Sequence, residues 1–268
     1  MPIPTHEERI GTVLGGKYRI DQILGLGGMG AVFAGVHQLT GRSVAVKLLH
    51  HEHVRNPESG ERFLREARTA AEIRHPNVVD ILDMGVEPDG TVFMVLELLQ
   101  GMTLAQVLEQ THQLGHAQAA DILIPVMRAL VYAHRKNIIH RDLKPDNIFV
   151  HEDSTGGVVP KLLDFGIAKA IDQSSARVTQ TGFILGTPSY MSPEQVAGLH
   201  DKVGPQSDVW AMGVVWYETL TGEAPFDGPT PTATLMNINS GRVIHIGDKL
   251  PDLPRALCDA IDRALLRD

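Results

Sequence analysis

The stretch HRDLKPDNIFV, residues 140–150, decides how the rest of this chain is interpreted. Charged and polar residues crowd its first eight positions, and the last three, from Ile148 to Val150, are apolar. A loop that runs directly into an apolar strand can hold its polar groups at a fixed place, and binding and catalytic residues often lie on such loops. The sequence therefore predicts a functional site here, and the flanking segments indicate its chemistry.

Composition and charge describe a folded chain with no sign of a nucleic-acid or membrane partner. Of the 268 residues, 43% are hydrophobic and 21% are charged, as in ordinary globular proteins. The net charge is -8 and no dense Lys/Arg block is present, so we expect no nucleic-acid binding and no polybasic membrane contact.

The sequence also bears on the cellular compartment. A single cysteine, Cys258, cannot form an internal disulfide, and the amino terminus lacks the pattern of a secretion signal. No uninterrupted apolar stretch approaches the roughly 18 to 20 residues needed to span a bilayer. We therefore expect a cytoplasmic chain without a membrane segment. The cytoplasmic domain of a longer, membrane-anchored receptor kinase is the alternative.

Strand patterns dominate the first part of the chain. From residue 17 to about 99, β-branched residues alternate around glycines and turns, which predicts antiparallel strands. Within this part, residues 58–74 carry apolar side chains at helical spacing, and Pro76 follows shortly after. These residues predict one amphipathic helix among the strands.

Helical patterns dominate the remainder. Two long helices are predicted, over 117–137 and 207–222. Pro125 should kink the first, and the second is apolar on nearly every face, which indicates a course through a core. The stretch HEDSTGGVVP, residues 151–160, predicts a loop inserted between two short strands.

The glycine-rich stretch GLGGMG, residues 25–30, matches G-x-G-x-x-G, a pattern that is weak by itself. In a dinucleotide-binding fold a helix would follow, whereas here a hairpin pattern follows. We therefore expect a flap that folds over phosphates and lets them approach the backbone closely. A plain glycine turn remains the alternative.

Lys47 ends the apolar strand that follows this hairpin. A functional role for its ammonium group requires a carboxylate partner, and Glu66 lies in the predicted helix that should pack against the sheet. For Lys47 the alternative is an ordinary solvent-reaching lysine, and for Glu66 a solvated helix position.

The loop at 140–150 carries the groups that phosphoryl transfer needs. Asp142 supplies a carboxylate for the hydroxyl proton, Lys144 a cation, and Asn147 an oxygen ligand for Mg²⁺. A second carboxylate, Asp164, follows a short apolar strand. Each residue alone is more often a turn or cap residue, but their combination in this order predicts a phosphoryl-transfer site.

Together these motifs resemble the protein kinase family over nearly the whole chain. GLGGMGAV resembles the glycine-rich loop, VAVK the lysine strand, HRDLKPDN the catalytic loop and DFG the metal-binding motif, and MSPE, residues 191–194, stands where kinases usually carry A-P-E. GGMG, Lys144 and GTPSYMSPEQ are most similar to the bacterial serine/threonine kinases of eukaryotic (Hanks) type.

The resemblance implies an α+β, two-lobed fold. Residues 1–16 would be an N-terminal extension. Residues 17–100 would form a small antiparallel β-sheet lobe with one key helix. Residues 101–268 would form a larger, mainly helical lobe that stops before its last helix.

The resemblance also implies roles for single residues. Asp142 would orient the substrate hydroxyl and accept its proton, and Lys144 would meet the γ-phosphate of ATP. Asn147 and Asp164 would hold Mg²⁺, or Mn²⁺ in its place. Lys47, kept in place by Glu66, would steady the α and β phosphates. The other implied ATP-binding positions are Leu24, Gly25, Gly27, Gly28, Gly30, Val32, Ala45, Leu96, Glu97, Leu98, Leu99 and Phe149.

Regulation and bracing are implied in the same way. Arg141, beside Asp142, would bind a phosphothreonine of the following loop, where Thr179 and Thr181 are the candidate phosphosites. Thr187 resembles the residue that contacts the catalytic loop near Asp142.

Three further residues have implied structural roles. Asp208 would brace the backbone of the catalytic loop, with a helix N-cap as its alternative. Glu194 normally pairs with an arginine, so either that partner lies beyond the chain or Arg263 replaces it. His140 should pack on Phe165.

These features favour a kinase that phosphorylates Ser and Thr hydroxyls of proteins and its own loop. Two alternatives remain. A pseudokinase would keep the fold as a binding scaffold, but such proteins lose Lys47, Asp142 or Asp164, all of which are present. A small-molecule kinase would usually lack a segment such as GTPSYMSPEQ. Self-association for trans-phosphorylation is a further expectation.

Overall fold

The structure is a computed structural model that describes residues 5–27, 30–49, 67–153, 155–165 and 188–267. These residues fall into two compact units. The first contains the described residues up to 74 together with 79–100, and the second contains 75–78 and the described residues from 101 onward. Each unit has its own secondary structure.

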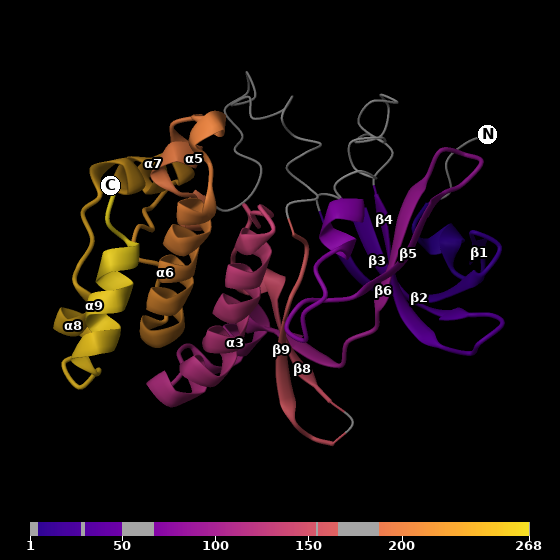
Figure 1. The fold of residues 1–268 in the computed structure, drawn as a ribbon, viewed down its shortest axis with the longest axis horizontal. Coiled ribbons are helices and arrows are strands. Elements are labelled where there is room, and N and C mark those ends of the chain that lie inside the picture. Colours follow the sequence, from indigo (N-terminus) through magenta and orange to yellow (C-terminus); the bar gives the residue numbers. More distant parts are fainter. Residues whose placement is uncertain (1–4, 28–29, 50–66, 154, 166–187, 268) are drawn as a thin grey trace. The chain divides into compact units, whose positions relative to one another are not determined.

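The first unit is built on one six-stranded antiparallel sheet in the order β1-β2-β3-β4-β6-β5 (Figure 1). A 3-10 helix, η1, precedes the sheet at Glu7–Arg9. The strands are β1 (Val13–Leu14), β2 (Tyr18–Gly27), β3 (Gly30–His37), β4 (Ser43–Leu49), β5 (Ile81–Val86) and β6 (Val92–Glu97). The predicted antiparallel strands are confirmed.

Apolar side chains at every second position of the strands give this sheet one face that packs into the core. Val44, Val46 and Leu48 on β4 are buried in a cluster with Phe33 and Phe93 from the neighbouring strands. Successive side chains of a strand point to opposite faces, so the intervening residues of β4 lie on the other side of the sheet.

The N-terminal segment expected as an extension is part of the first unit. β1 pairs with β2, and Leu14, only 1% exposed, belongs to the core cluster. The guanidinium of Arg9 lies 3.0 Å from a carboxylate oxygen of Asp89 and donates to Oγ1 of Thr91 at 2.7 Å. Residues from Arg9 to Leu14 are thus bound to the sheet by both apolar and polar contacts.

Only the end of the predicted helix 58–74 can be compared with the structure, because residues 50–66 lie outside the described ones. Residues 67–71 are helical. Ala67, Ala70 and Ile73 are buried, in agreement with the apolar face that the spacing predicts.

The second unit combines one small sheet with helices (Figure 1). The sheet has the order β7-β8-β9, with β7 at Gly101–Thr103, β8 at Ile148–Glu152 and β9 at Val158–Leu162. The α-helices are α2 (Leu104–Thr111), α3 (His116–Arg135), α5 (Pro193–Val196), α6 (Pro205–Thr221), α7 (Pro231–Ser240), α8 (Ile246–Lys249) and α9 (Arg255–Ala264). Short 3-10 turns are η3 (Pro145–Asn147), η4 (Pro188–Tyr190) and η5 (His200–Lys202).

Helix α6 is the central helix of this unit, as its apolar sequence predicts. Most of its residues are buried, among them both tryptophans of the chain. Gly204 and Pro205 begin the helix, and Gly222 follows its end with φ of 78°, a left-handed conformation that glycine adopts at no steric cost. Figure 1 shows α6 beside α3 and α9.

Helix α3 confirms the first long helix that the sequence predicts. It extends from His116 to Arg135, and its bounds include Pro125. The buried residues of α3 recur at helical spacing, so one face of this helix is directed into the core.

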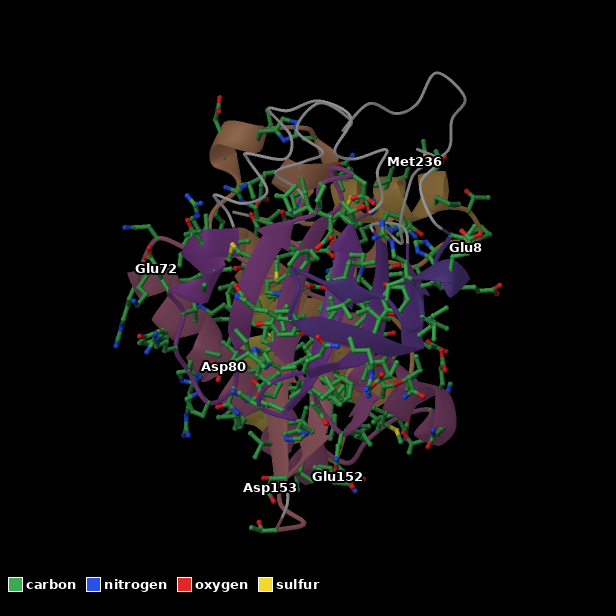
Figure 2. The ribbon with its side chains drawn as sticks, turned by 90° about the vertical axis from the view of Figure 1, so that its right-hand side faces the viewer. Glu8, Glu72, Asp80, Glu152, Asp153 and Met236 are labelled. Atoms are coloured by element: carbon green, nitrogen blue, oxygen red, sulfur yellow. The ribbon has the colours of Figure 1, made fainter. Side chains whose placement is uncertain are left out.

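The β8–β9 hairpin corrects the predicted loop at 151–160. His151 and Glu152 belong to β8, and Val158 to Pro160 belong to β9, so the connection is shorter than expected. Backbone pairing extends the strands into the polar segment because Asp153 closes the turn itself. Its carboxylate accepts hydrogen bonds from the backbone N–H groups of Thr155 and Gly157, both at 2.8 Å. Figure 2 labels Glu152 and Asp153 at the tip of this hairpin.

Among the described residues, no helix has the length and apolar character that would let it cross a membrane.

Candidate active site

The second unit gathers three of the predicted catalytic residues at one turn. The 3-10 turn η3 brings Asn147 back toward Asp142. The side-chain amide of Asn147 donates to the carbonyl oxygen of Asp142 at 2.7 Å and to its carboxylate at 3.1 Å. Nζ of Lys144 lies 3.3 Å from the same carboxylate oxygen. The carboxylate of Asp142 is thus held by an amide and a cation, and all three side chains are at least partly buried.

The backbone just before Asp142 is braced by a buried carboxylate on α6. Asp208, 1% exposed, accepts hydrogen bonds from the backbone N–H of His140 through Oδ2 and of Arg141 through Oδ1, both at 2.8 Å. Arg141 has φ of 67°, a conformation that L side chains adopt rarely. The alternative role of Asp208 as a helix N-cap is wrong, because Gly204 is the N-cap of α6 and Asp208 lies inside the helix.

His140 connects this loop to the segment that carries Asp164. Its Nε2 lies 2.7 Å from the carbonyl oxygen of Leu163, and its ring packs on Phe165 with centroids 4.9 Å apart. The predicted contact between His140 and Phe165 is therefore confirmed. The backbone N–H of Leu163 donates to the carbonyl oxygen of Asn147 at 2.8 Å. Asp164, the next residue, is thereby placed beside the turn that holds Asn147.

Asn147 and Asp164 fit a hard divalent cation. A carboxylate and an amide oxygen are the ligand types that Mg²⁺ prefers, and Mg²⁺ usually takes its remaining ligands from water and phosphates. The amide nitrogen of Asn147 faces Asp142, which leaves its oxygen for a ligand. Among the residues that the structure describes, no group of three or more His, Cys, Asp or Glu side chains could hold a metal by itself. A cation held by Asn147 and Asp164 would take its remaining ligands from water and phosphate groups.

The glycine-rich stretch forms the predicted hairpin in the first unit. Gly25 pairs with Val32, and Gly27 pairs with Gly30, so β2 and β3 converge at the connection. At Gly30 a Cβ atom would meet the carbonyl oxygen of Leu48 at 1.8 Å, and φ is 155°. Only glycine fits this close approach, and the pattern is confirmed as a strand hairpin rather than the start of a helix.

One face of this sheet carries the predicted nucleotide-binding side chains. Val32 lies directly opposite Lys47, and Ala45 directly opposite Leu96. Residues directly opposite on neighbouring strands share a face, and Ala45 and Lys47 are two positions apart on β4. These four residues therefore lie on the face opposite the apolar core cluster, where Val32, Lys47 and Leu96 are partly exposed and Ala45 is buried.

The other predicted ATP-binding positions are distributed between the two units. Glu97 is the last residue of β6, and its carboxylate accepts a hydrogen bond of 2.9 Å from the backbone N–H of Asp80. Leu24 is half exposed on β2, and Leu98 and Leu99 follow β6 and are partly exposed. Phe149 lies on β8 of the second unit, where it is partly exposed.

Some of the predicted site residues lie outside the described residues. They are Gly28, Glu66, Thr179, Thr181 and Thr187.

Comparison with known proteins agrees with this geometry. The sequence model of the protein kinase domain matches residues 18–257, which is most of the chain. The chain belongs to the protein kinase family. The family and the two-lobed fold predicted from the motifs are thus confirmed, and the family implies the use of ATP and a divalent cation.

Several bacterial protein kinases are similar to this kinase domain over almost its full length. The serine/threonine-protein kinase PknA of Mycobacterium tuberculosis is 42% identical over 250 residues, which cover 92% of this chain and 54% of PknA. A probable serine/threonine-protein kinase PknB of Lactococcus lactis is 38% identical over 97% of this chain and 40% of that protein. The kinase pkn2 of Myxococcus xanthus is 40% identical over 96% of this chain and 31% of that protein. The chain thus spans between about a third and about half of their length.

Two residues of the kinase site were missed by the sequence analysis. His134, near the end of α3, has its Nε2 2.7 Å from Oδ2 of Asp208. Gln195 on α5 donates from Nε2 to the carbonyl oxygen of Arg141 at 2.9 Å. A polar side chain on the largely apolar helix α3 was the signal for His134, whereas the only signal for Gln195 was its place in the quoted segment GTPSYMSPEQ.

Glu194 has a partner within the chain that the sequence did not suggest. One carboxylate oxygen accepts a hydrogen bond from the hydroxyl of Ser207 on α6. Within the described residues, no Lys or Arg nitrogen lies at ion-pair distance from Glu194, so Arg263 does not pair with it. Through Ser207, Glu194 connects α5 to the start of α6.

Proposed function

We propose that this chain is the catalytic domain of a serine/threonine protein kinase, which transfers the γ-phosphate of ATP to Ser and Thr hydroxyls of proteins. The observation that supports this most is the group formed by Asp142, Lys144 and Asn147, with an amide and a cation on one carboxylate. The three relatives named above are all serine/threonine-protein kinases, which supports the same reaction.

Asp142 acts on the hydroxyl of the substrate. Its carboxylate orients that hydroxyl and accepts its proton as the oxygen bonds to the γ-phosphorus and the bond from this phosphorus to the bridging oxygen of ADP breaks, a role typically worth about 10² to 10⁴ in rate. Lys144 offsets negative charge on the phosphate that moves. Most of the remaining catalysis is positioning and electrostatic stabilisation, since phosphoryl transfer needs little covalent chemistry from the protein.

Asn147 and Asp164 would hold the divalent cation, Mg²⁺ or Mn²⁺, which would neutralise phosphate charge when bound. Lys47, supported by Glu66, binds the α and β phosphates.

Val32, Ala45 and Phe149 contact the adenine, and the backbone near Glu97 and Leu99 binds its edge. The remaining proposed nucleotide-binding positions are Leu24, Gly25, Gly27, Gly28, Gly30 and Leu96.

The domain also phosphorylates itself in this proposal. Thr179 and Thr181 receive the phosphate, and Arg141 binds the phosphothreonine. The transfer occurs between two copies, so the rate per molecule should rise with protein concentration. We place the domain in the cytoplasm, where ATP is available and a single cysteine stays reduced.

Intact-mass measurement tests the proposal directly. Purified protein is incubated with ATP and either Mg²⁺ or Mn²⁺, beside the variant Asp142→Asn and the double variant of Thr179 and Thr181 to alanine. We expect added phosphate in the parent only, mapping to the two threonines, together with phosphorylation of an added protein substrate. An unchanged mass with retained nucleotide binding would instead indicate a pseudokinase, and phosphate transfer only to small alcohols would indicate a small-molecule kinase.

A further inference from the structure

The peptide unit between Arg141 and Asp142 is held on both of its edges. Its N–H, which belongs to Asp142, lies 3.3 Å from Nδ1 of His140. Its carbonyl oxygen, which belongs to Arg141, accepts a hydrogen bond from Nε2 of Gln195 at 2.9 Å. The orientation of this one peptide plane sets the direction in which the Asp142 side chain leaves the backbone.

Gln195 is itself fixed at the other end of its amide. Its Oε1 accepts from the backbone N–H of Ser192 at 3.0 Å and lies 3.3 Å from the Ser192 hydroxyl. Ser192 is fully buried. Because an N–H group can only donate and a carbonyl oxygen can only accept, the amide of Gln195 has one orientation that satisfies both neighbours.

The conformation at Arg141 explains why such support is needed. A non-glycine residue with φ of 67° is strained and persists only where surrounding contacts hold it. Asp208 holds the N–H of Arg141, and Gln195 holds its carbonyl oxygen, so both polar backbone groups of the strained residue are bound. The two supports come from different helices, α5 and α6, and lie 54 and 67 positions from Arg141 along the chain.

We propose that Gln195 is a positioning residue for phosphoryl transfer, which fixes the Arg141–Asp142 peptide and so aims the carboxylate of Asp142. This proposal rests on the proposed kinase function. Gln195 does not contact the reacting atoms and acts only through this peptide. It also connects the segment 192–196 to the catalytic loop, so displacement of that segment would turn the peptide that carries Asp142.

The variant Gln195→Glu separates this role from a structural one. Glutamate keeps the oxygen that accepts from Ser192, and therefore keeps the capping contact at the start of α5. It replaces the donor with an oxygen that faces the carbonyl of Arg141. We expect a smaller fall in melting temperature than the loss of both hydrogen bonds would cause, a kcat about tenfold lower and an unchanged KM for ATP.

Two further variants serve as controls. Gln195→Met keeps the length of the side chain and removes both hydrogen bonds, so it should lower the melting temperature as well as kcat. Gln206→Glu makes the same chemical change at a glutamine that donates to the carbonyl oxygen of Lys202 in an exposed segment. This variant should leave kcat unchanged.

Amide spectra give a readout that does not depend on activity. In ¹H–¹⁵N spectra the amide of Asp142 should shift in Gln195→Glu and stay in place in Gln206→Glu. A parent-like kcat and Asp142 amide in Gln195→Glu, in an active parent protein, would overturn the positioning role alone. An inactive parent would overturn the proposed function, and the Asp142 amide would then still decide whether Gln195 orients this peptide.

Discussion

The carboxylate of Asp208 accepts a hydrogen bond of 2.8 Å from the backbone N–H of Arg141, which lies 67 positions earlier in the sequence. The carboxylate lies on the central helix α6, and the residue it holds has a left-handed backbone conformation immediately before Asp142. The most buried helix of the second unit thus directly determines the geometry of the catalytic loop.

Asp208→Asn should weaken this connection. One carboxylate oxygen becomes an NH₂ group that faces a donor, so we expect a loss of about 1–3 kcal/mol in the free energy of unfolding. The catalytic rate should fall further than that of any surface variant, because the loop loses its support. Denaturant unfolding and initial rates measure the two effects. Asp201→Asn, an exposed residue of η5, is the control, and equal behaviour of the two variants would refute the role of Asp208.

Tyr190→Phe should destabilise the second unit. The Tyr190 hydroxyl donates to Oε2 of Glu218 at 2.8 Å, and burial raises the pKa of both groups, with the charge of Glu218 adding to the effect on Tyr190. Removal of the hydroxyl leaves a largely buried carboxylate without this donor, at a cost of about 1–3 kcal/mol. Thermal unfolding at neutral pH should reveal the loss. A melting temperature equal to that of the parent would show that water replaces the donor.

Glu218→Gln should change how stability depends on pH. A carboxyl whose pKa is raised on folding binds its proton more tightly in the folded state. The usual pKa of a glutamate is about 4.3, and the pKa of Glu218 in the folded protein is higher. The parent therefore loses stability as the pH rises from the usual pKa through the raised one. The glutamine variant lacks this loss, so the difference in unfolding free energy between the two proteins should grow in its favour over that interval. A constant difference would contradict the raised pKa.

Arg9→Ala tests whether the N-terminal segment is anchored. The Arg9 side chain is 8% exposed and binds Asp89 and Thr91, so its removal should cost about 1–2 kcal/mol, allowing for the partial exposure of Asp89. Arg19→Ala is the matched control, because Arg19 pairs with Asp21 on the surface and should contribute nothing measurable. Chemical denaturation compares them, and equal midpoints would argue against anchoring.

Leu14→Ala tests the same segment through its apolar contact. Leu14 is 1% exposed in the core cluster, so truncation should cost about 2–5 kcal/mol of unfolding free energy. Leu39, 89% exposed, provides the control for a leucine-to-alanine change. If both variants unfold at the same denaturant concentration, the segment before Lys17 is not part of the first unit's core.

Contacts that are local in sequence could be predicted well. Asp142, Lys144 and Asn147 lie within six positions, and one turn brings them together, so their spacing alone indicated a shared site. Strand alternation similarly predicted β2 to β6, since each strand's pattern depends on its own residues. The hairpin at 148–162 was predicted less accurately, because Asp153 closes its turn with hydrogen bonds that no periodicity reveals.

Contacts between distant segments were predicted only where the family resemblance implied them, as for Asp208 and for His140 with Phe165. His134 and Gln195 lie 74 and 54 positions from their partners, and nothing in their immediate neighbours marks them as part of the site. The two-residue strand Val13–Leu14 is too short for a pattern of its own, and it exists because β2 offers an unpaired edge.

By itself the sequence determined the family, the order of strands and helices, and the short motifs that carry the chemistry, because these depend on spacing along the chain. The bracing role of Asp208 was implied by the family resemblance, but only the tertiary structure showed that Gln195 holds the same loop and that His134 contacts Asp208. Gln195 and His134 act on atoms that folding brings within about 3 Å, and hydrogen bonds at that range depend on distance in space rather than on position in the sequence.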